Sequence, residues 1–337
     1  MNAVSESYKA LPEQNVSTWL KDRLVCPRDH SSLSFEGGKI LCEQGHLYPS
    51  VEGIPVLLLS DVPQTHGEAI KALEVAWMEN AAERVGIGST SDTINPHVQQ
   101  LVASTCGLLY RPLIGKLRRY PIPELRLPEG QERSFLDIGC SWGRWTIAAA
   151  RKKYRAIGMD PSLGAVLVAR QVSRQLGLDC EFIVADARYL PFRSEAIDAV
   201  FSYSVIQHFR KEDAYQALAG IGRVLTASGR CLVQMPNKYG LRSLYHVARR
   251  ANRAPTGFEV RYWTPSELKR VFQDKIGKAE ITVDGFFGLG IQASDLDLLP
   301  QAYRMIARAS EWLRVLSHYV PFMSNLADSL FVEVRRK

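Results

Sequence analysis

Seven residues beginning at Asp137 place the strongest constraint on how this 337-residue chain can fold. The stretch Asp137-Ile-Gly-Cys-Ser-Trp-Gly143 overlaps a short apolar run, 135–138, of the kind that forms a buried parallel strand. Gly139 and Gly143 allow sharp turns, and their missing side chains leave room for a ligand near the main chain. Residues 144–153, which include three consecutive alanines, then have the composition of a helix. This order predicts a nucleotide-type α/β unit.

The spacing of the small residues excludes a dinucleotide fingerprint. That fingerprint needs glycine at positions 139, 141 and 144, and this chain has Ser141 and Arg144. The loop instead resembles the first motif of class I S-adenosylmethionine-dependent methyltransferases, an acid followed by small residues at alternate positions. Ser141 stands where that motif usually has its middle glycine. The resemblance implies that the cofactor contacts residues of this loop, namely Asp137, Gly139, Cys140, Ser141 and Gly143.

Acidic residues follow the loop where further strands are expected to end. Asp160 comes about twenty residues on, the position from which an acid can hydrogen-bond ribose hydroxyls. A third apolar run ends in Asp186 and Ala187, and in this family such an acid accepts from the adenine amino group. Residues 198–208 then predict a fourth strand leading into the active-site loop. By the same resemblance, the side chains facing the methionine end of the cofactor are Ser202 and Tyr203.

Two later segments complete the resemblance. Residues 224–235 are similar to the family's turn into its fifth strand, and residues 262–268 resemble the helix start that precedes its last two strands. A single acid at a strand end is explained by helix capping, whereas five elements in the right order are not. By this resemblance residues 131–290 form the S-adenosylmethionine-binding methyltransferase domain. Its expected fold is α/β, Rossmann-like and doubly wound, with a mostly parallel seven-stranded sheet.

A second constellation lies upstream, in residues 1–64, which we expect to be a small β domain. Cys26 and His30 form a C-x3-H pattern, and Cys42 and His46 repeat it after a predicted hairpin. Two cysteines and two histidines paired across a hairpin can supply the four tetrahedral ligands of a structural zinc ion. The sequence therefore predicts a structural zinc site here.

The same segment resembles the zinc ribbon of the tRNA-methyltransferase activator type, and the ribbon of large-ribosomal-RNA guanine methyltransferases. Those ribbons usually carry a second cysteine where this chain has Asp29. Three alternatives stay open: His30 replaces that cysteine, Asp29 contributes an oxygen, or the hairpin packs without metal. A disulfide between Cys26 and Cys42 is a fourth, disfavoured because the remaining four cysteines are scattered through apparent core.

Helical patterning surrounds the expected catalytic domain. Residues 65–130 predict a helical linker, and residues 291–337 predict a C-terminal helical extension. The resemblance implies that the linker covers the cofactor as a lid, and a plain connector packed on the sheet is the alternative. With 46% hydrophobic residues and 23% charged residues, the chain can bury a full core. The longest apolar run, 54–59, is too short for a membrane helix, and no apolar signal segment begins the chain, so a cytoplasmic protein is expected.

The expected activity is methyl transfer to an O or N atom of a small-molecule acceptor such as a metabolite, lipid, sugar or quinone. His208 is the candidate base, since it follows the fourth strand and imidazole titrates near neutrality. An RNA base methyltransferase is an alternative, because the net charge is +7 and the ribbon would read RNA. A non-catalytic cofactor-binding protein that serves a partner is the third hypothesis.

Overall fold

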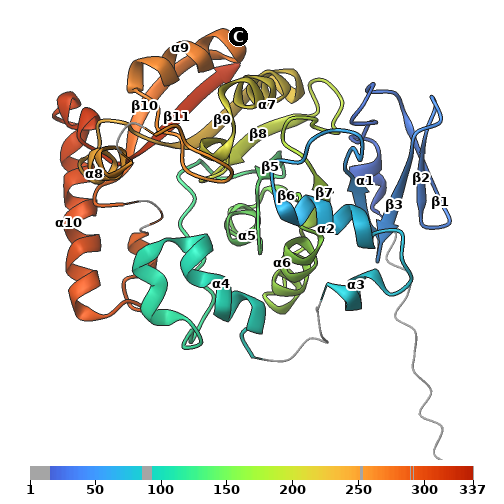
Figure 1. The fold of residues 1–337 in the computed structure, drawn as a ribbon, viewed down its shortest axis with the longest axis horizontal. Helices are drawn as coiled ribbons and strands as arrows, with labels where there is room; N and C mark the ends of the chain where they lie inside the picture. Colours follow the sequence, from blue (N-terminus) through green and yellow to red (C-terminus); the bar gives the residue numbers. More distant parts are fainter. Residues whose placement is uncertain (1–15, 86–92, 251–252, 289, 291, 337) are drawn as a thin grey trace, which may run out of the picture.

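The computed structural model describes residues 16–85, 93–250, 253–288, 290 and 292–336. These residues form one eleven-stranded mixed sheet, drawn across the middle of Figure 1. The strands from β4 to β9 in sheet order are parallel, and both ends of the sheet are antiparallel. In sheet order the strands are β1 (Leu33–Glu36), β2 (Lys39–Cys42), β3 (Leu47–Val51), β4 (Ile54–Leu57), β7 (Glu181–Ala185), β6 (Arg155–Asp160), β5 (Ser134–Ile138), β8 (Ile197–Ser202), β9 (Leu225–Pro236), β11 (Ser329–Arg336) and β10 (Gly277–Gly285). The predicted α/β class with a parallel core is confirmed.

Helices cover both faces of this sheet, with α7 and α9 on one face and α5 and α6 on the other (Figure 1). The α-helices are α1 (Thr18–Lys21), α2 (Gly67–Val75), α3 (Ala81–Arg84), α4 (Pro96–Cys106), α5 (Arg144–Arg151), α6 (Leu163–Gln175), α7 (Lys211–Val224), α8 (Leu241–Arg249), α9 (Pro265–Lys275) and α10 (Gln301–Ser317). Short 3-10 helices are η1 (Leu108–Leu113), η2 (Ile206–His208), η3 (Ala293–Asp295) and η4 (Pro321–Asn325). Within the described ranges, no helix has both the length and the apolar character needed to cross a bilayer.

The turn after β5 explains why a glycine occupies position 139. Gly139 adopts a φ of +77°, and a Cβ there would lie 2.2 Å from a Val205 methyl carbon. The main-chain N–H groups of Gly139 and Cys140 both donate to the Met159 carbonyl, at 2.7 and 3.0 Å. The loop is therefore held between the strand β6 on one side and the chain after β8 on the other. Only a residue without a side chain fits this close approach.

The N-terminal strands belong to the same sheet as the parallel core. β4 pairs in parallel with β7, with Val56 opposite Val184 and Leu57 opposite Ala185. All four residues of β4 are buried, which accounts for the apolar run that the sequence shows from residue 54. Without β4, β7 would be an apolar edge strand whose free N–H and C=O groups could pair with other chains, so β4 covers that edge.

The last strand corrects the expectation for residues 291–337. Helix α10 is present as predicted, but residues 329–336 form β11, which lies between β9 and β10 and is antiparallel to both. Val332 faces Val233 on one side and Ile281 on the other, and its side chain is fully buried. The sequence analysis missed this strand because a short apolar run followed by three basic residues resembles a tail. Pairing along both edges makes it a central strand.

We predict that Val332→Ala lowers the free energy of unfolding by about 2 kcal/mol, because it removes two buried methyl groups from the sheet core. Urea unfolding followed by circular dichroism measures this change. Glu333→Ala is the matched control in the same strand, where the side chain is partly exposed, and we expect a change below about 0.5 kcal/mol. Equal effects of the two substitutions would contradict the central position of β11.

Candidate functional site

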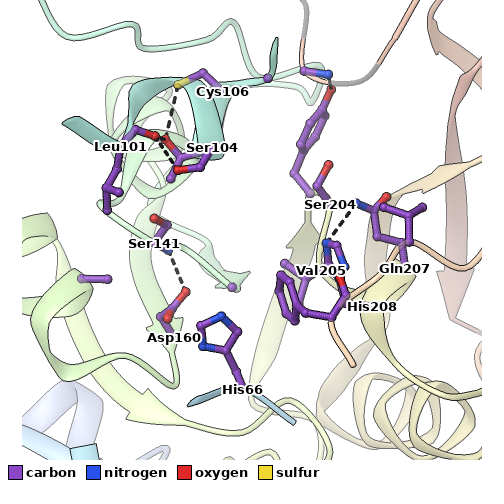
Figure 2. Close-up of a pocket in the computed structure, with 18 of the residues that line it drawn as sticks. His66, Leu101, Ser104, Cys106, Ser141, Asp160, Ser204, Val205, Gln207 and His208 are labelled. Carbon is purple, nitrogen blue, oxygen red and sulfur yellow. Dashed lines mark hydrogen bonds between the residues drawn. The ribbon is translucent and has the colours of Figure 1, made fainter. Parts of the chain in front are cut away.

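A cavity of about 1150 Å³ opens at the carboxyl ends of the parallel strands. The chain order reverses here, since β6 and β8 lie on opposite sides of β5. Ligands of open α/β sheets bind at this point, beyond the carboxyl ends of the strands. Figure 2 shows Ser141 and Asp160 on one side of the pocket and His208 and Gln207 on the other. The cavity is therefore the candidate active site.

Asp160 ends β6, and its carboxylate is held in a fixed orientation by main-chain donors. The Ser141 N–H donates to Oδ2 and the Ser162 N–H donates to Oδ1, both at 2.9 Å. Burial raises the pKa of Asp160 above its ordinary value, while these two hydrogen bonds oppose the rise. A carboxylate can accept about four hydrogen bonds, so two positions are open to a ligand. Asp160 can thus accept from a pair of neighbouring hydroxyls.

Six of the ten predicted cofactor residues line the cavity: Gly139, Ser141, Asp160, Asp186, Ala187 and Tyr203. The other four support the loop from behind. Asp137 is buried and accepts from the Thr146 hydroxyl at 2.7 Å, and burial raises its pKa to about 7. The Ser202 hydroxyl donates to the Ile138 carbonyl at 3.1 Å, which joins β8 to β5. The remaining two are Cys140, whose thiol is buried, and Gly143, which packs against Ala169.

Asp186, the residue expected to accept from an amino group of the ligand, is hydrogen-bonded to Arg188 in this structure. The Arg188 guanidinium donates to both carboxylate oxygens, at 2.7 to 3.1 Å. The main-chain N–H of Arg188 also donates to Oδ1 of Asp186, at 2.8 Å. These bonds use most of the acceptor capacity of the carboxylate, so its main effect is to hold the loop beside Ala187.

The other walls come from segments outside the central domain. His66, Glu68 and Lys71 line the cavity from the start of α2, and residues 103–109 line it from the end of α4 and the chain that follows. The predicted lid segment therefore does face the cavity. A further wall, from α8 and the chain after it, was not among the expected parts of the site. The available signal was the spacing of Arg242, His246 and Arg250, four residues apart on one helix face.

His208 lies in η2 and is held on both ring nitrogens. Its Nδ1 is 2.7 Å from the Phe258 carbonyl, and its Nε2 is 3.2 Å from Nε2 of Gln207. The ring stacks on Phe258 with centroids 3.8 Å apart. Burial lowers the pKa of His208 to about 4, so the imidazole is neutral at physiological pH. A neutral ring with this pKa is a weak base and a good hydrogen-bonding partner.

The sequence model of a family described as "Methyltransferase domain" matches residues 135–229, from β5 to the start of β9. This chain contains a class I S-adenosylmethionine-dependent methyltransferase domain. The donors and acceptors of the cavity fit that cofactor, because loop main chain and the Asp160 carboxylate meet in one space. When bound, the cofactor supplies an electrophilic methyl group on a sulfonium.

Relatives of the methyltransferase domain carry different names. A human protein named probable tRNA methyltransferase 9B is 30% identical over 141 residues, which cover 41% of this chain and 28% of that protein. The biotin biosynthesis bifunctional protein BioHC of Cellvibrio japonicus is 28% identical over 200 residues, covering 58% and 39%. A ubiquinone biosynthesis O-methyltransferase of Agrobacterium fabrum is 28% identical over 80 residues, covering 24% and 32%. The match thus spans well under two thirds of each of these relatives.

Among solved structures, an S-adenosylmethionine-dependent methyltransferase from Methanosarcina mazei is similar to this chain with a TM-score of 0.44 and 19% identity. The similarity covers 65% of this chain and 99% of that chain.

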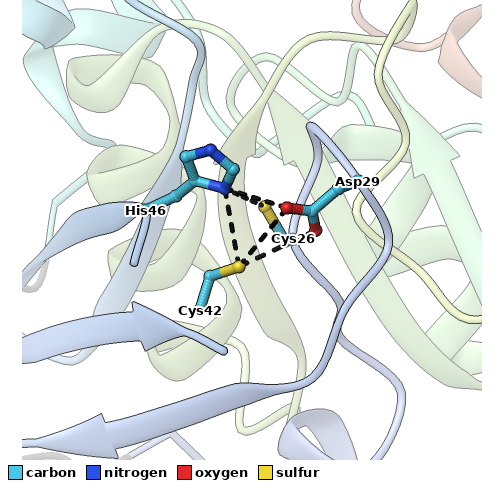
Figure 3. A group of neighbouring side chains, drawn as sticks. All are labelled: Cys26, Asp29, Cys42 and His46. Atoms are coloured by element: carbon cyan, nitrogen blue, oxygen red, sulfur yellow. Dashed lines mark hydrogen bonds and ion pairs between the residues drawn. The ribbon is translucent and has the colours of Figure 1, made fainter. Parts of the chain in front are cut away.

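A second group of side chains lies at the far edge of the sheet from β10. Cys26, Asp29, Cys42 and His46 point toward one another, with ligand atoms all within 4.8 Å (Figure 3). His46 Nδ1 lies 3.5 Å from each cysteine sulfur and 3.0 Å from an Asp29 oxygen. Tetrahedral zinc bound to sulfur, nitrogen and oxygen places its ligand atoms about 3.3 to 3.8 Å apart. The group therefore fits a zinc ion, and Asp29 takes the place predicted for His30.

His30 is exposed and lies outside this group, with a positive φ of 61°. The loop instead turns Asp29 inward, where Ser31 donates to its carboxylate from both N–H and hydroxyl, at 2.9 and 2.7 Å. These bonds lower the pKa of Asp29 and keep it ionised. Two residues separate Asp29 from Cys26, whereas three separate His30 from it.

We predict that the purified protein holds about one zinc ion per chain and that Asp29→Ala lowers this content at least tenfold. The substitution removes one of four ligands, which leaves an incomplete coordination shell. Metal analysis by mass spectrometry, with a chelator competition for affinity, measures the loss. His30→Ala is the matched control and should retain zinc, and the reverse result would make His30 the ligand.

We also predict that His208 makes the folded state less stable as pH falls. Its pKa is about 4 in the folded protein and about 6.5 in an unfolded chain, so only the unfolded state gains the proton between these values. The stability is complete above pH 6.5 and decreases as pH falls toward 4. Urea unfolding at pH 7 and 4.5 should show a smaller decrease for His208→Gln than for the wild type. Substitution of the exposed His318 by Gln is the control, and an equal decrease in all three proteins would refute a neutral His208.

Proposed function

We propose that this protein transfers a methyl group from S-adenosylmethionine to an O or N atom of a small-molecule acceptor. The observation that carries the proposal is the volume of the cavity, together with its enclosure by elements outside the glycine loop. At about 1150 Å³ it exceeds the roughly 300 to 1000 Å³ typical of a site for one small ligand. Walls from α2, α4 and α8 close it on the sides that the glycine loop leaves open. This leaves room for an acceptor beside the cofactor.

In this proposal the cofactor lies along the carboxyl ends of β5, β6 and β7. Asp160 accepts from the two ribose hydroxyls, and Ala187 borders the adenine. The loop at Gly139 and Ser141 faces the methionine portion, and Tyr203 borders its other side. The protein's contribution to rate is alignment of acceptor and methyl group in a space that excludes water.

The proposed part of His208 is to form a fixed, uncharged part of the wall beside the acceptor, because both of its ring nitrogens are already hydrogen-bonded within the protein. With a pKa of about 4 it is too weak to take a proton from an ordinary hydroxyl at neutral pH. An acceptor atom that is already nucleophilic, such as an unprotonated amine or an acidic hydroxyl, suits a neutral imidazole. The proposal for the compartment is the cytoplasm, since the six cysteines, all within the described residues, form no disulfide, as is typical of a reducing environment.

An RNA acceptor is the second candidate, favoured by the printed name of the human relative and by the net charge of +7. In that case the Cys26–His46 segment would be the part that contacts RNA. The candidate zinc site lies beside β1 to β3, at the opposite edge of the sheet from β10 (Figure 1). The candidate active site lies beyond β5 and β6, so an RNA that contacts both sites would have to extend across several strands.

The decisive experiment mixes the protein and labelled S-adenosylmethionine with small-molecule and RNA fractions of the source cell. We expect label in the small-molecule fraction. Label confined to RNA would reverse the assignment, and no label with normal cofactor binding would support a non-catalytic partner protein.

We predict that Asp160→Ala weakens S-adenosylhomocysteine binding at least tenfold, since the ribose hydroxyls lose a charged acceptor. Isothermal calorimetry measures the affinity. Asp179→Ala, which removes the same charge from an exposed position after α6, should change the affinity less than twofold. Unchanged binding in Asp160→Ala would refute the cofactor pose.

A further inference from the structure

A second cavity of about 580 Å³ adjoins the candidate active site. It is bordered by the start of α7, the end of α8 and the chain segment 253–263. Three residues line both spaces: Arg250, Val260 and Tyr262. We call this second space the basic groove. Because of this shared wall, the basic groove lies directly beside the candidate active site.

Positive charge is concentrated in the basic groove. One acidic residue lines it, Glu212. Six basic side chains line it as well: Arg210, Lys211, Lys238, Arg250, Arg253 and Arg261. Two of the six have carboxylate partners, Lys211 with Glu267 at 3.2 Å and Arg253 with Glu259 at 2.7 Å. The other four are not neutralised by an ion pair within the described segments.

Two of these four donate to main-chain carbonyls. Arg250 donates to the Val260 carbonyl at 2.7 Å, and Arg261 donates to the His208 carbonyl at 2.6 Å. A carbonyl orients a guanidinium and leaves its charge in place. Burial lowers the pKa of Arg261, and the positive charges of Arg210 and Arg250 lower it further, while Asp213 and Glu259 oppose this. Like charges held this close repel one another, and an anion between them relieves the repulsion.

We propose that the basic groove binds an anionic group, phosphate or carboxylate, carried by the methyl acceptor. The inference rests on the proposed small-molecule methyl transfer and names its substrate class. The anionic end lies among Arg210, Lys238 and Arg250, and the rest of the acceptor passes Tyr262 into the main cavity. The acceptor is therefore a molecule of two parts, one charged and one that reaches the methyl group.

The contact of Arg261 with His208 couples the groove to the reacting end. The Arg261 N–H also donates to the Gln207 carbonyl at 2.8 Å, so one groove residue holds the main chain of η2 from two sides. An anion bound beside Arg261 would thus lie against the support of the His208 ring. This makes Arg261 a positioning residue for the acceptor wall.

A small anion suits the geometry better than a nucleic acid. The six cations converge on one concave space, whereas a nucleic-acid path needs basic residues spread along the backbone of several nucleotides. The acidic residues Glu212, Glu259 and Glu267 around the groove would also repel neighbouring phosphates of a longer chain.

The first test titrates pyrophosphate and, separately, citrate into protein saturated with S-adenosylhomocysteine. The variant Arg210→Ala with Lys238→Ala should bind these anions at least tenfold more weakly than the wild type. The matched control is Arg151→Ala with Lys278→Ala, which removes the same two charge types from exposed positions on α5 and β10. The control should change anion affinity less than twofold, and both variants should keep wild-type affinity for S-adenosylhomocysteine.

Tighter binding of pyrophosphate indicates a phosphate group, and tighter binding of citrate indicates carboxylates. Absence of binding by both, or equal losses in the variant and its control, would overturn the proposal. A short RNA that binds a hundredfold more tightly than pyrophosphate and depends on the same two residues would overturn it in favour of RNA. Loss of S-adenosylhomocysteine binding in the wild type would instead count against the proposed function.

The second test follows the labelled product. Small-molecule product should be retained on an anion-exchange column, and the groove variant should raise the KM for that acceptor at least tenfold with kcat within about threefold. Product that passes the column unretained would refute the anionic acceptor while leaving methyl transfer in place.

Discussion

The hydrogen bond from the Ser141 N–H to the Asp160 carboxylate fixes the geometry on which the candidate site depends. It joins the loop after β5 to the end of β6, and the Ser162 N–H holds the other carboxylate oxygen from the next loop. Ser141 makes this bond in a left-handed conformation, with a φ of 49°, where the family motif usually has glycine. Strain of about 1 to 2 kcal/mol is the expected cost of such a backbone. The packed loop and this charged acceptor together offset it.

The opposite wall is fixed by a chain of polar side chains that crosses three strands. The Ser204 N–H donates to the Gln234 side chain at 2.9 Å, and Gln234 donates to the Ser329 hydroxyl at 2.8 Å. Ser329 and Tyr203 in turn both donate to one oxygen of Asp284, at 2.7 and 2.6 Å. Because β11 supplies Ser329, the loop after β8 can be held only when the C-terminal strand is in place. A fully connected buried network of this kind orients its members strongly.

Sequence reasoning succeeded where a function needs a residue type at a fixed strand end. The glycine loop and Asp160 were predictable because backbone approach and a ribose acceptor leave few chemical choices. It failed for β11, because the strand is defined by its pairing with β9 and β10. It also failed to choose Asp29 over His30 as the metal ligand, because the directions of their side chains depend on the local turn geometry. Arg250 was not predicted as a site residue, since a basic residue at a helix end has the same sequence pattern whether it faces solvent or a cavity.

Arg188 connects the chain that precedes α2 to the loop after β7 and to the start of α7. Its guanidinium binds the Asp186 carboxylate, donates to the Pro63 carbonyl at 2.7 Å, and reaches Asp213 of α7 at 3.3 Å. Pro63 lies in the connection that leads from β4 to α2, so this connection and the loop at Asp186 are joined through one buried cation. Asp186, directly after β7, thus orients an arginine that joins the chain before α2, the loop at Ala187 and the start of α7.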